Sequence, residues 1–438
     1  MTFEDCKRFV FGLLVLLTIH NTYGQDLPPE KPNIILIMAD DLGYETLGCN
    51  GGDSYPTPRL DQLSEEGMLF ENCFSTPLCT PSRVQLMTGK YNFRNYIGFG
   101  LLDPSEKTFG HFLQEAGYTT CIAGKWQLYG NARQQKLAGG RTGTLPQDAG
   151  FDQYCLWQVK ELGSRYKNPT VEMNGIGTRT FDKGYGPDIF VEYIETFIET
   201  HQNQPFFVYF PMCLTHDPFV PTPASSEFEN FDSKSKTNDP KYFGEMVGYM
   251  DNVVGRLVDK VNALGLRENT LILFIGDNGT DRKITSVMKG REIKGDKGHT
   301  TMAGTHVPFI ASWKGKVKAG THNKNLIDFT DFLPSLLDIT GQTTQKKSER
   351  TDGLSFYPQL LGKKTKAREW VFCHYDPRWG KFEPQRYVQN TQWKLYETGA
   401  IFNLQKDPEE KFPLQEKDLP RKTKSLIRQF YQVLENLQ

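Results

Sequence analysis

The sequence predicts an α/β fold with a large mixed, mostly parallel sheet sandwiched by helices, followed by a small antiparallel sheet and a helix. Four short and almost wholly apolar runs carry the first part of this prediction, because strands of a parallel sheet are buried on both faces. They cover residues 34–38, 119–123, 206–210 and 271–275. Amphipathic patterns separate the runs, and after residue 368 the pattern changes to short alternating segments. We therefore expect strands and helices to alternate through most of the chain, with a separate small sheet near its end.

The first residues predict a targeting segment rather than a part of the fold. Lys7 and Arg8 precede the apolar stretch 9–17, and small residues offer a cleavage site before Gln25. We expect residues 1–24 to be a signal peptide and the mature protein to be exported, either periplasmic or secreted. An uncleaved anchor is the alternative, although the stretch is shorter than the roughly 20 residues that span a bilayer. No later segment is long and apolar enough, so we expect no stable membrane insertion.

Residues 25–341 are expected to form the larger domain. Within it, apolar side chains at helical spacing predict helices over 107–116 and 242–264. Polar and irregular stretches at 160–183 and 225–241 predict loops over the edge of the sheet, where specificity is often decided.

Residues 342–438 are expected to form a smaller C-terminal subdomain. Alternating segments at 370–372, 393–396 and 401–404 predict antiparallel strands. Apolar residues at helical spacing over 421–438 predict a packed terminal helix.

Composition and cysteine usage exclude some classes of protein. The 438 residues carry a net charge of −1, which gives no electrostatic case for nucleic acid or an anionic membrane. None of the eight cysteines forms a CxxC pair, which argues against a zinc site. Cys121 and Cys213 lie in or beside predicted strands and are expected to be buried. A disulfide is permitted in an exported protein, but the spacing assigns none.

Polar residues follow each of the four apolar runs. Asp40 and Asp41 follow the first run, Lys125 the second and His216 the third, while Asp277 and Asn278 follow the fourth; these are the predicted strand ends. Ligands of open α/β sheets bind outside the carboxyl ends of the strands. A single polar loop after a strand is ordinary. Four such loops, carrying side chains that bind cations or are themselves cationic, predict that these side chains converge on one crevice.

A further motif begins at Cys79 and reads C-T-P-S-R, continuing through L-M-T-G-K. It predicts a thiol just before a helix, with Pro81 at the first helical position and Thr88-Gly89 at the C-cap. Arg83 lies one turn into this helix. A helix N-terminus with an arginine beside it suits an anion.

The full run resembles the signature of the sulfatase family, and two later stretches, 331–341 and 352–362, resemble further landmarks of that family. The resemblance covers nearly the whole mature chain. It implies an alkaline-phosphatase-like fold, in which 25–341 is the sulfatase catalytic domain and 342–438 completes the substrate cleft. It also implies that Cys79 is oxidised after translation to formylglycine, the catalytic aldehyde.

By the same resemblance, one calcium ion is expected at the strand ends, held by Asp40, Asp41, Asp277 and Asn278 together with residue 79. All four side chains offer the hard oxygen donors that calcium prefers. A cation would also relieve the repulsion between clustered carboxylates.

The remaining matched positions bind the sulfate and the leaving group. The resemblance implies that Arg83, Lys125 and Lys297 hold the sulfate, and that His216 contacts the leaving-group oxygen. A hydroxyl of the hydrated aldehyde would attack sulfur in line, with Asp277 as its base. His216, assisted by Lys297, would protonate the departing alcohol, and the second hydroxyl would then expel sulfate.

Several positions depart from the family pattern. Gln127 stands where the family usually has a histidine, and glutamine cannot act as a base. Met302 and His306 replace a glutamate and an arginine, which is expected to affect packing more than chemistry. A serine that contacts sulfate in some relatives has no clear counterpart here, and Ser164 is the candidate for that position. To replace the missing base we consider His299, two residues after Lys297; a solvent-exposed loop role is equally compatible with the sequence.

The sequence thus predicts a calcium-dependent sulfatase that acts on an organic sulfate ester. A sulfated glycan is the favoured substrate for two reasons. The protein is expected to be exported, and the sequence offers the aromatic and basic side chains Trp126, Trp157, Trp379, Arg165 and Arg378 for contacts with a sugar. A phosphodiesterase or phosphonate hydrolase of the same fold is one alternative, and a catalytically impaired sulfated-glycan-binding relative is another. The expected partner is an enzyme that matures Cys79, either formylglycine-generating or anaerobic.

Overall fold

The four apolar runs form four neighbouring parallel strands at the centre of a sheet. They are β1 (Asn33–Ala39), β3 (Thr119–Lys125), β7 (Phe206–Pro211) and β8 (Thr270–Gly276). The computed structural model describes residues 31–160, 162–342 and 350–437. β1 lies between β7 and β8, and all of its seven residues are buried, as the unbroken apolar run predicts.

Ten strands make up this sheet, in the order β12-β2-β11-β8-β1-β7-β3-β4-β5-β6. The other six are β2 (Met68–Phe74), β4 (Gln153–Trp157), β5 (Thr170–Met173), β6 (Gly177–Thr180), β11 (His306–Ser312) and β12 (Thr321–Asp328). β11 runs antiparallel to both β2 and β8, and β5 runs antiparallel to β4. The sheet is therefore mixed and mostly parallel, as predicted.

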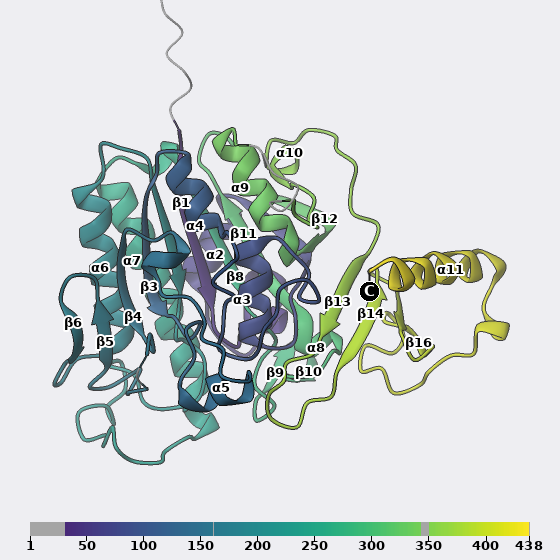
Figure 1. Cartoon of the computed structure of the whole chain (residues 1–438), viewed down its shortest axis with the longest axis horizontal. Helices are drawn as coiled ribbons and strands as arrows, with labels where there is room; N and C mark the ends of the chain where they lie inside the picture. The colour runs from purple at the N-terminus through teal and green to yellow at the C-terminus, as the bar shows by residue number, and fades with distance from the viewer. Residues whose placement is uncertain (1–30, 161, 343–349, 438) are drawn as a thin grey trace, which may run out of the picture. The chain divides into compact units, whose positions relative to one another are not determined.

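Helices cover both faces of the sheet and enclose two apolar cores (Figure 1). One face packs against α3 (Cys79–Thr88), α4 (Phe109–Glu115), α9 (Phe332–Thr340) and α10 (Tyr357–Leu360). The other packs against α2 (Pro58–Glu65), α6 (Gly186–Thr200) and α7 (Phe243–Ala263). The predicted helices over 107–116 and 242–264 are thus confirmed as α4 and α7.

The stretch 160–183, expected to be irregular, contains a hairpin instead. β5 and β6 pair antiparallel there and extend the sheet by two strands beyond β4. All four residues of β6 are exposed, because this is the edge of the sheet. A polar, solvent-facing edge strand lacks the apolar alternation that identifies a strand in a sequence. The second stretch, 225–241, ends in the short 3-10 helix η4 (Pro240–Tyr242).

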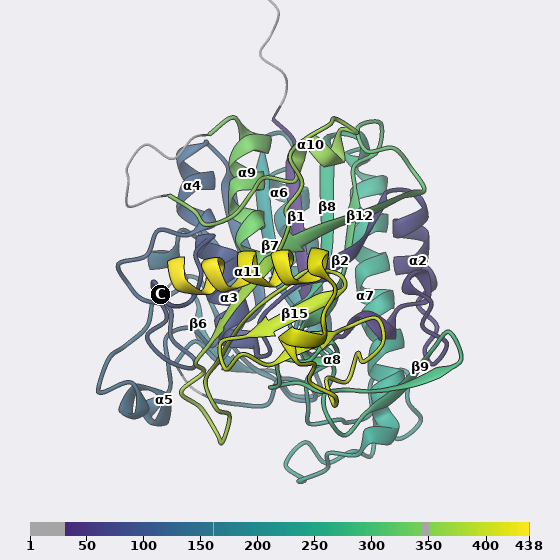
Figure 2. The same ribbon diagram turned by 90° about the vertical axis from the view of Figure 1, so that its right-hand side faces the viewer.

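The C-terminal residues form the predicted small antiparallel sheet and helix (Figure 2). The sheet has the order β13-β14-β15-β16, and α11 lies across it. These elements are β13 (Val371–Tyr375), β14 (Gln385–Gln389), β15 (Trp393–Tyr396), β16 (Ile401–Asn403) and α11 (Arg421–Asn436). The buried side chains Ile427, Phe430 and Leu434 of α11 pack on the sheet, which explains their helical spacing.

The remaining described elements are short. They are a hairpin of β9 (Thr285–Met288) and β10 (Arg291–Lys294), the helices α5 (Ala132–Leu137) and α8 (Met302–Thr305), and the 3-10 turns η1 (Tyr44–Thr46), η2 (Gly48–Asn50), η3 (Gln147–Ala149), η5 (Arg267–Asn269), η6 (Phe329–Asp331) and η8 (Glu416–Asp418).

Three expectations concern export, membranes and cysteines. The predicted signal peptide, 1–24, lies outside the described residues. Across 31–160, 162–342 and 350–437, no helix has the length and apolar character needed to cross a bilayer. The seven cysteines in these ranges are all free thiols, and Cys121 and Cys213 are buried as predicted.

Candidate active site

The carboxyl ends of β1 and β8 bring two predicted carboxylates side by side. Ala39 pairs with Gly276, so Asp40 and Asp277 each come directly after the last residue of a strand. The backbone N–H of Asp41 donates to Asp277 Oδ1 at 2.9 Å, and that of Asp277 donates to Ala39 O at 3.0 Å. Asp41 has a φ of 62°, a left-handed conformation that aspartate tolerates better than most residues. This turn carries the chain out of the strand while the two carboxylates stay together.

Three buried side-chain oxygens at these strand ends have no hydrogen-bond partner: Asp40 Oδ1, Asp277 Oδ2 and Asn278 Oδ1. The Asn278 amide is oriented by its Nδ2, which donates to Asp41 Oδ1 at 2.9 Å. The ligand atoms of Asp40, Asp277 and Cys79 lie within 4.8 Å of one another. Buried polar atoms are seldom left unpaired. The structure thus brings together all five residues expected to hold a cation.

The residues present fit a hard divalent cation. Burial raises the pKa of Asp277 well above its usual value, and the neighbouring Asp40 and Asp41 raise it further. The first effect is the cost of removing a charge from water, and the second is repulsion between carboxylates; a bound cation would offset both. The donor set is all carboxylate and amide oxygen apart from residue 79, and calcium prefers oxygen ligands.

Two lysines, the buried Lys125 and the half-buried Lys297, neutralise part of this charge. Lys125 Nζ lies 2.8 Å from Asp40 Oδ2, and both side chains are 2% exposed. Lys297 Nζ lies 2.5 Å from Asp41 Oδ2. Burial alone would raise the pKa of Asp40, but Lys125 and the other cations hold it well below its usual value. For Lys297, burial acts to lower the pKa, and Asp41 outweighs it and raises the value. Both ammonium groups therefore remain charged at neutral pH.

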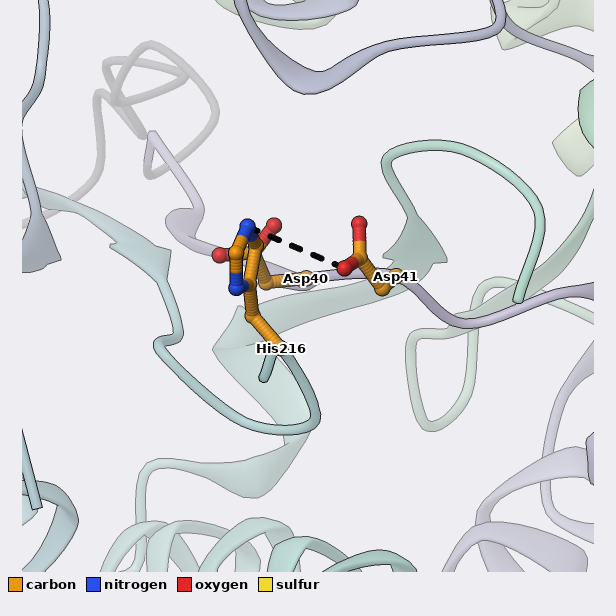
Figure 3. Close-up of side chains that lie close together, drawn as sticks. All are labelled: Asp40, Asp41 and His216. Atoms are coloured by element: carbon orange, nitrogen blue, oxygen red, sulfur yellow. Dashed lines mark ion pairs between the residues drawn. The ribbon is translucent and has the colours of Figure 1, made fainter. Parts of the chain in front are cut away.

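His216 stands beside the two aspartates (Figure 3). Its Nε2 lies 3.0 Å from Lys297 Nζ and 3.8 Å from Asp41 Oδ2. On the other side of the ring, Nδ1 lies 2.9 Å from an oxygen of Asp217, and this contact lowers the pKa of the Asp217 carboxyl. The side chains of His216 and Lys297 are 17% and 16% exposed, so the cluster meets solvent at this point.

The predicted motif forms α3, with Gly89 in the left-handed C-cap conformation as expected. The helix begins at Cys79 itself, so Pro81 is its third residue and not its first. Proline is tolerated there because the N–H groups of the first turn have no partner within the helix. All ten residues of α3 are buried, which places the Cys79 side chain inside the protein at the head of the helix.

Arg83 fixes the end of β3 to α3. Its Nη2 donates to Lys125 O at 2.7 Å and its Nη1 to Trp126 O at 2.5 Å, and the whole side chain is buried. These bonds hold the backbone that carries Lys125. Gly124, just before Lys125, has a φ of 122°, and a Cβ there would lie 2.0 Å from Pro211 O. A glycine is therefore required for β3 to pass so close to β7.

Gln127 lies next to the thiol. Cys79 Sγ is 3.8 Å from Gln127 Oε1, and the backbone N–H of Gln127 donates to Gln158 O at 3.0 Å. Gln127 has a φ of 44° and is partly exposed. Burial raises the pKa of the Cys79 thiol above its usual value, although Lys125 opposes this. An unmodified thiol at this position stays neutral at pH 7.

His299 does not join the cluster in the described contacts. Gly298 turns the chain with a φ of 88°, and the His299 ring then lies 3.2 Å from Asp296 and edge-on to Phe382. It lines a cavity of about 380 Å³ together with residues of the small sheet, and neither Cys79 nor a lysine is among the lining residues.

The other side chains that were expected to contact sulfate or a sugar make contacts within the protein. Ser164 Oγ donates to Lys167 O at 2.8 Å within its own loop, so it is engaged there. Trp126 and Trp157 were expected to face a sugar, but they are 0% and 1% exposed and belong to the two cores. This expectation was wrong because Trp126, directly after β3, packs in the core on one face of the sheet, and Trp157, the last residue of β4, packs in the core on the other. Trp379 is partly buried and stacks on Phe99.

His306 and Met302 serve packing, as expected. The His306 ring stacks on Tyr44 and Phe74 at centroid distances of 4.0 and 5.1 Å. Met302 packs among apolar residues of the small sheet.

The sequence offered little signal for two further residues. Thr215 N–H donates to Asp40 O at 2.7 Å, and its Oγ1 lies 3.3 Å from the carbonyl oxygens of both Asp40 and Asp41. Asp217 orients His216, and its position directly after the histidine could have suggested that role. A lone threonine in a loop carries no comparable pattern.

Comparison with known proteins agrees with this geometry. Residues 32–342 match the family described as Sulfatase, and residues 296–438 match the family described as N-sulphoglucosamine sulphohydrolase, C-terminal. The chain is 28% identical to N-acetylgalactosamine-6-sulfatase of Canis lupus familiaris, covering 88% of this chain and 82% of that protein. It is 27% identical to N-acetylgalactosamine-6-O-sulfatase of Bacteroides thetaiotaomicron, covering 93% of each.

A solved structure shows the same arrangement of elements. The crystal structure of Ps i-CgsB superposes with a TM-score of 0.76 at 26% identity, covering 93% of this chain and 92% of that one. A second structure of that protein is a complex with k-i-k-neocarrahexaose.

Proposed function

Since the chain belongs to the sulfatase family and is a sulfuric ester hydrolase, we propose that it hydrolyses a carbohydrate sulfate ester with formylglycine at residue 79 and one calcium ion. The supporting observation is the position of Cys79, buried at the head of α3 with its sulfur close to Asp40 and Asp277. No other described cysteine belongs to such a group of candidate cation ligands.

The chemistry of the site argues for a modified residue 79. Because burial keeps the Cys79 thiol neutral, an unmodified side chain would be a poor nucleophile at pH 7. Oxidised to formylglycine, the residue would instead supply a hydrated aldehyde whose hydroxyl can attack sulfur.

The proposed calcium ion would be held by Asp40, Asp41, Asp277 and Asn278 together with residue 79. The three unpartnered oxygens described above support this set. When bound, the ion would polarise the sulfate and favour the ionised form of the attacking hydroxyl.

The chain's own side chains account for the remaining steps. Lys125 and Lys297 remain charged and stabilise the negative charge on the sulfuryl oxygens. His216 donates a proton from Nε2 to the departing sugar oxygen. Lys297 Nζ lies 3.0 Å from Nε2 and can then donate a hydrogen bond to this unprotonated nitrogen. Arg83 keeps Lys125 in place through the two carbonyls that it binds.

Gln127 alters the step in which sulfate is released. Its Oε1 can accept a hydrogen bond from residue 79 but cannot take a proton. Because the contacts of His299 point elsewhere, we expect release to be slow, and Gln127→His to accelerate it.

The substrate class, the export of the protein and its maturation are parts of the same proposal. The named activities of the relatives and the sugar complex of Ps i-CgsB support a sulfated glycan. The N-terminal sequence supports a signal peptide and a periplasmic or secreted location. An enzyme that oxidises Cys79, either formylglycine-generating or anaerobic, would be the required partner.

The test combines turnover with the mass of residue 79. The full-length protein is produced with a maturation enzyme, supplied with calcium, and assayed on 4-nitrophenyl sulfate, 4-nitrophenyl phosphate and an aryl phosphonate. We expect sulfate turnover to dominate and the peptide that contains residue 79 to carry the mass of the aldehyde. Cys79→Ala should abolish turnover with an unchanged melting temperature, whereas the partly exposed Cys49→Ala should keep it.

Each contrary result is distinct. Full activity of protein whose residue 79 is an unmodified thiol would refute the formylglycine mechanism. Faster turnover of the phosphate or phosphonate would identify a hydrolase of another ester class. Binding of sulfated sugars without turnover of any of them would identify a catalytically impaired relative.

A further inference from the structure

Arg165 lies over Trp157 in the loop that follows β4. Its guanidinium carbon is 4.0 Å from the centroid of the Trp157 ring. Trp157 pairs in parallel register with Lys125, and paired residues of parallel neighbours point to the same face of the sheet. The guanidinium is therefore held on the face of the sheet from which Lys125 reaches Asp40.

The next residue ties this loop to the active site. Tyr166 OH donates to Cys213 O at 2.7 Å and lies 2.5 Å from His216 O. Two parts of the active site therefore fix the position of Arg165. One is the end of β4, which lies beside Lys125, and the other is the loop that carries His216.

Arg165 has no anionic partner within 31–160, 162–342 and 350–437. Its Nη1 is buried and makes no hydrogen bond, and no carboxylate forms an ion pair with it. Among the buried cations, Lys125 is paired with Asp40 and Arg368 with Asp331, whereas Arg83 bonds to two backbone carbonyls. The residue as a whole is half-buried, so an anion from solvent can reach it. Because a guanidinium nitrogen without a partner is costly to bury, the group is suited to such an anion.

We propose that Arg165 binds a second anionic group of the substrate, a sulfate or a carboxylate, on or next to the sugar unit whose sulfate is hydrolysed. The planar guanidinium matches the paired oxygens of either group, and stacking on Trp157 holds it in position. This inference rests on the proposed function and deepens it, because it selects polyanionic glycans over singly sulfated ones.

Competition against 4-nitrophenyl sulfate hydrolysis tests the proposal. The inhibitors are N-acetylgalactosamine 6-sulfate, the 4,6-disulfate of the same sugar, and a disaccharide of a uronic acid with N-acetylgalactosamine 6-sulfate. We expect at least one dianion to bind the wild-type protein about 10-fold more tightly than the monosulfate, as one charge-assisted hydrogen-bonded pair allows. The two dianions distinguish a sulfate partner from a carboxylate partner. In Arg165→Gln, the ratio between dianion and monosulfate should fall to about one.

Arg133→Gln is the matched control, because Arg133 also lies over a tryptophan, Trp379 at 4.8 Å, but is exposed and has no buried unpaired nitrogen. It should keep the wild-type preference. Equal affinity of the wild-type protein for all three sugars, or no binding of any, overturns the proposal. A preference that survives in Arg165→Gln, or that falls equally in Arg133→Gln, overturns it as well.

Failure of the proposed function gives a different result. A protein that hydrolyses no aryl sulfate refutes the function, and calorimetric titration of the same three sugars then measures the affinity ratio directly. Melting temperatures of both variants separate loss of the anion contact from loss of the fold.

Discussion

Two of the buried clusters of charge in the described part of the chain differ in how completely their oxygens are paired. In the first, the Asp331 carboxylate accepts hydrogen bonds from Nε and Nη2 of Arg368. It also accepts from the backbone N–H of Leu354 at 2.6 Å and from that of Asp328 at 2.9 Å. Asp328 Oδ1 in turn accepts from Gln85 Nε2 at 2.7 Å. In the second, at the ends of β1 and β8, three oxygens remain without a partner.

The difference shows that burial and charge alone do not identify a functional site. Both clusters contain carboxylates and a cation that are almost fully buried. The Arg368 cluster is complete within the protein and joins the large sheet to the segment before β13. The strand-end cluster is incomplete, and what it lacks is positive charge and donors. We therefore read the first as structural and the second as a binding site.

The largest expected effect comes from Asp277→Asn. Removal of this carboxylate should reduce turnover of the calcium-loaded enzyme by about 10³-fold, since a catalytic cation contributes several kcal/mol. The metal-free protein should become no less stable, because burial and two neighbouring aspartates disfavour the Asp277 charge. Turnover and thermal melting without calcium are measured on the same preparation. A variant that keeps its turnover, or that melts far below the wild type, would remove the distinction between the clusters.

Arg368→Met tests the structural cluster. Breaking a buried ion pair leaves Asp331 without its cation, which typically costs 3–5 kcal/mol of unfolding free energy. Urea unfolding measures this loss, and turnover per folded molecule should stay near the wild-type value. The exposed Arg378→Met, whose ion pair with Asp376 is on the surface, is the control and should cost less than about 1 kcal/mol. Equal costs for both variants would contradict the structural role.

Calcium should stabilise the protein only through the incomplete cluster. At a free concentration 100 times the dissociation constant, binding adds about 2.7 kcal/mol to the unfolding free energy. We expect this gain, measured by urea unfolding with and without calcium, in the wild type and in Arg378→Met but not in Asp277→Asn. The same gain in Asp277→Asn would locate the ion elsewhere.

His306 is a third kind of group, half-buried and neutral. Burial lowers the pKa of His306 from 6.5 to about 4, although its hydrogen bond to Glu71 O acts in the other direction. The neutral form favours the fold, so this stability is complete above pH 6.5 and is lost as the pH falls toward 4. We expect a loss of about 2 kcal/mol over this range, discounted for partial exposure of the ring.

His306→Phe keeps the stacking on Tyr44 and Phe74 but cannot titrate. Its unfolding free energy should therefore change less between pH 6.5 and 4 than that of the wild type. His322→Phe, at an exposed position, should follow the wild-type profile. Parallel profiles for the wild type and His306→Phe would exclude the ring as the source.

The smallest effect is expected from His299→Ala. Because the described contacts of His299 are with Asp296 and Phe382, turnover of 4-nitrophenyl sulfate should change less than about twofold, below the 10²–10⁴-fold of a lost general base. A larger loss, with sulfate trapped on residue 79, would restore His299 as the base that Gln127 cannot be.

The sequence predicted the site residues better than their pairing. Asp40, Asp277 and His216 could be placed together because the carboxyl ends of neighbouring parallel strands share one edge of a sheet. Which lysine meets which aspartate depends on side-chain conformations that no spacing encodes. In the structure His299 contacts Asp296 and Phe382, and Gly298, with a φ of 88°, turns the chain between it and Lys297.

The fold was predictable where burial is uniform and less so at its edges. The unbroken apolar runs of β1 and β8 identify central strands, and the helical spacing over 242–264 identifies α7. The exposed hairpin of β5 and β6 pairs through backbone groups, with side chains that could equally belong to a loop. Edge strands are specified by their neighbours more than by their own residues.

The position of β1 in the sheet has a consequence for the synthesis of the protein. β1 is made early, but 236 residues separate Asp41 from Asp277, and 256 separate it from Lys297. At about 5–20 residues per second, a ribosome needs roughly 10–50 s to add the last of these partners. Cys79 is made early in that interval, before the strand and the lysine that later enclose it. From then until Lys297 is added, the thiol that is 1% exposed in the finished fold lacks these parts of its enclosure.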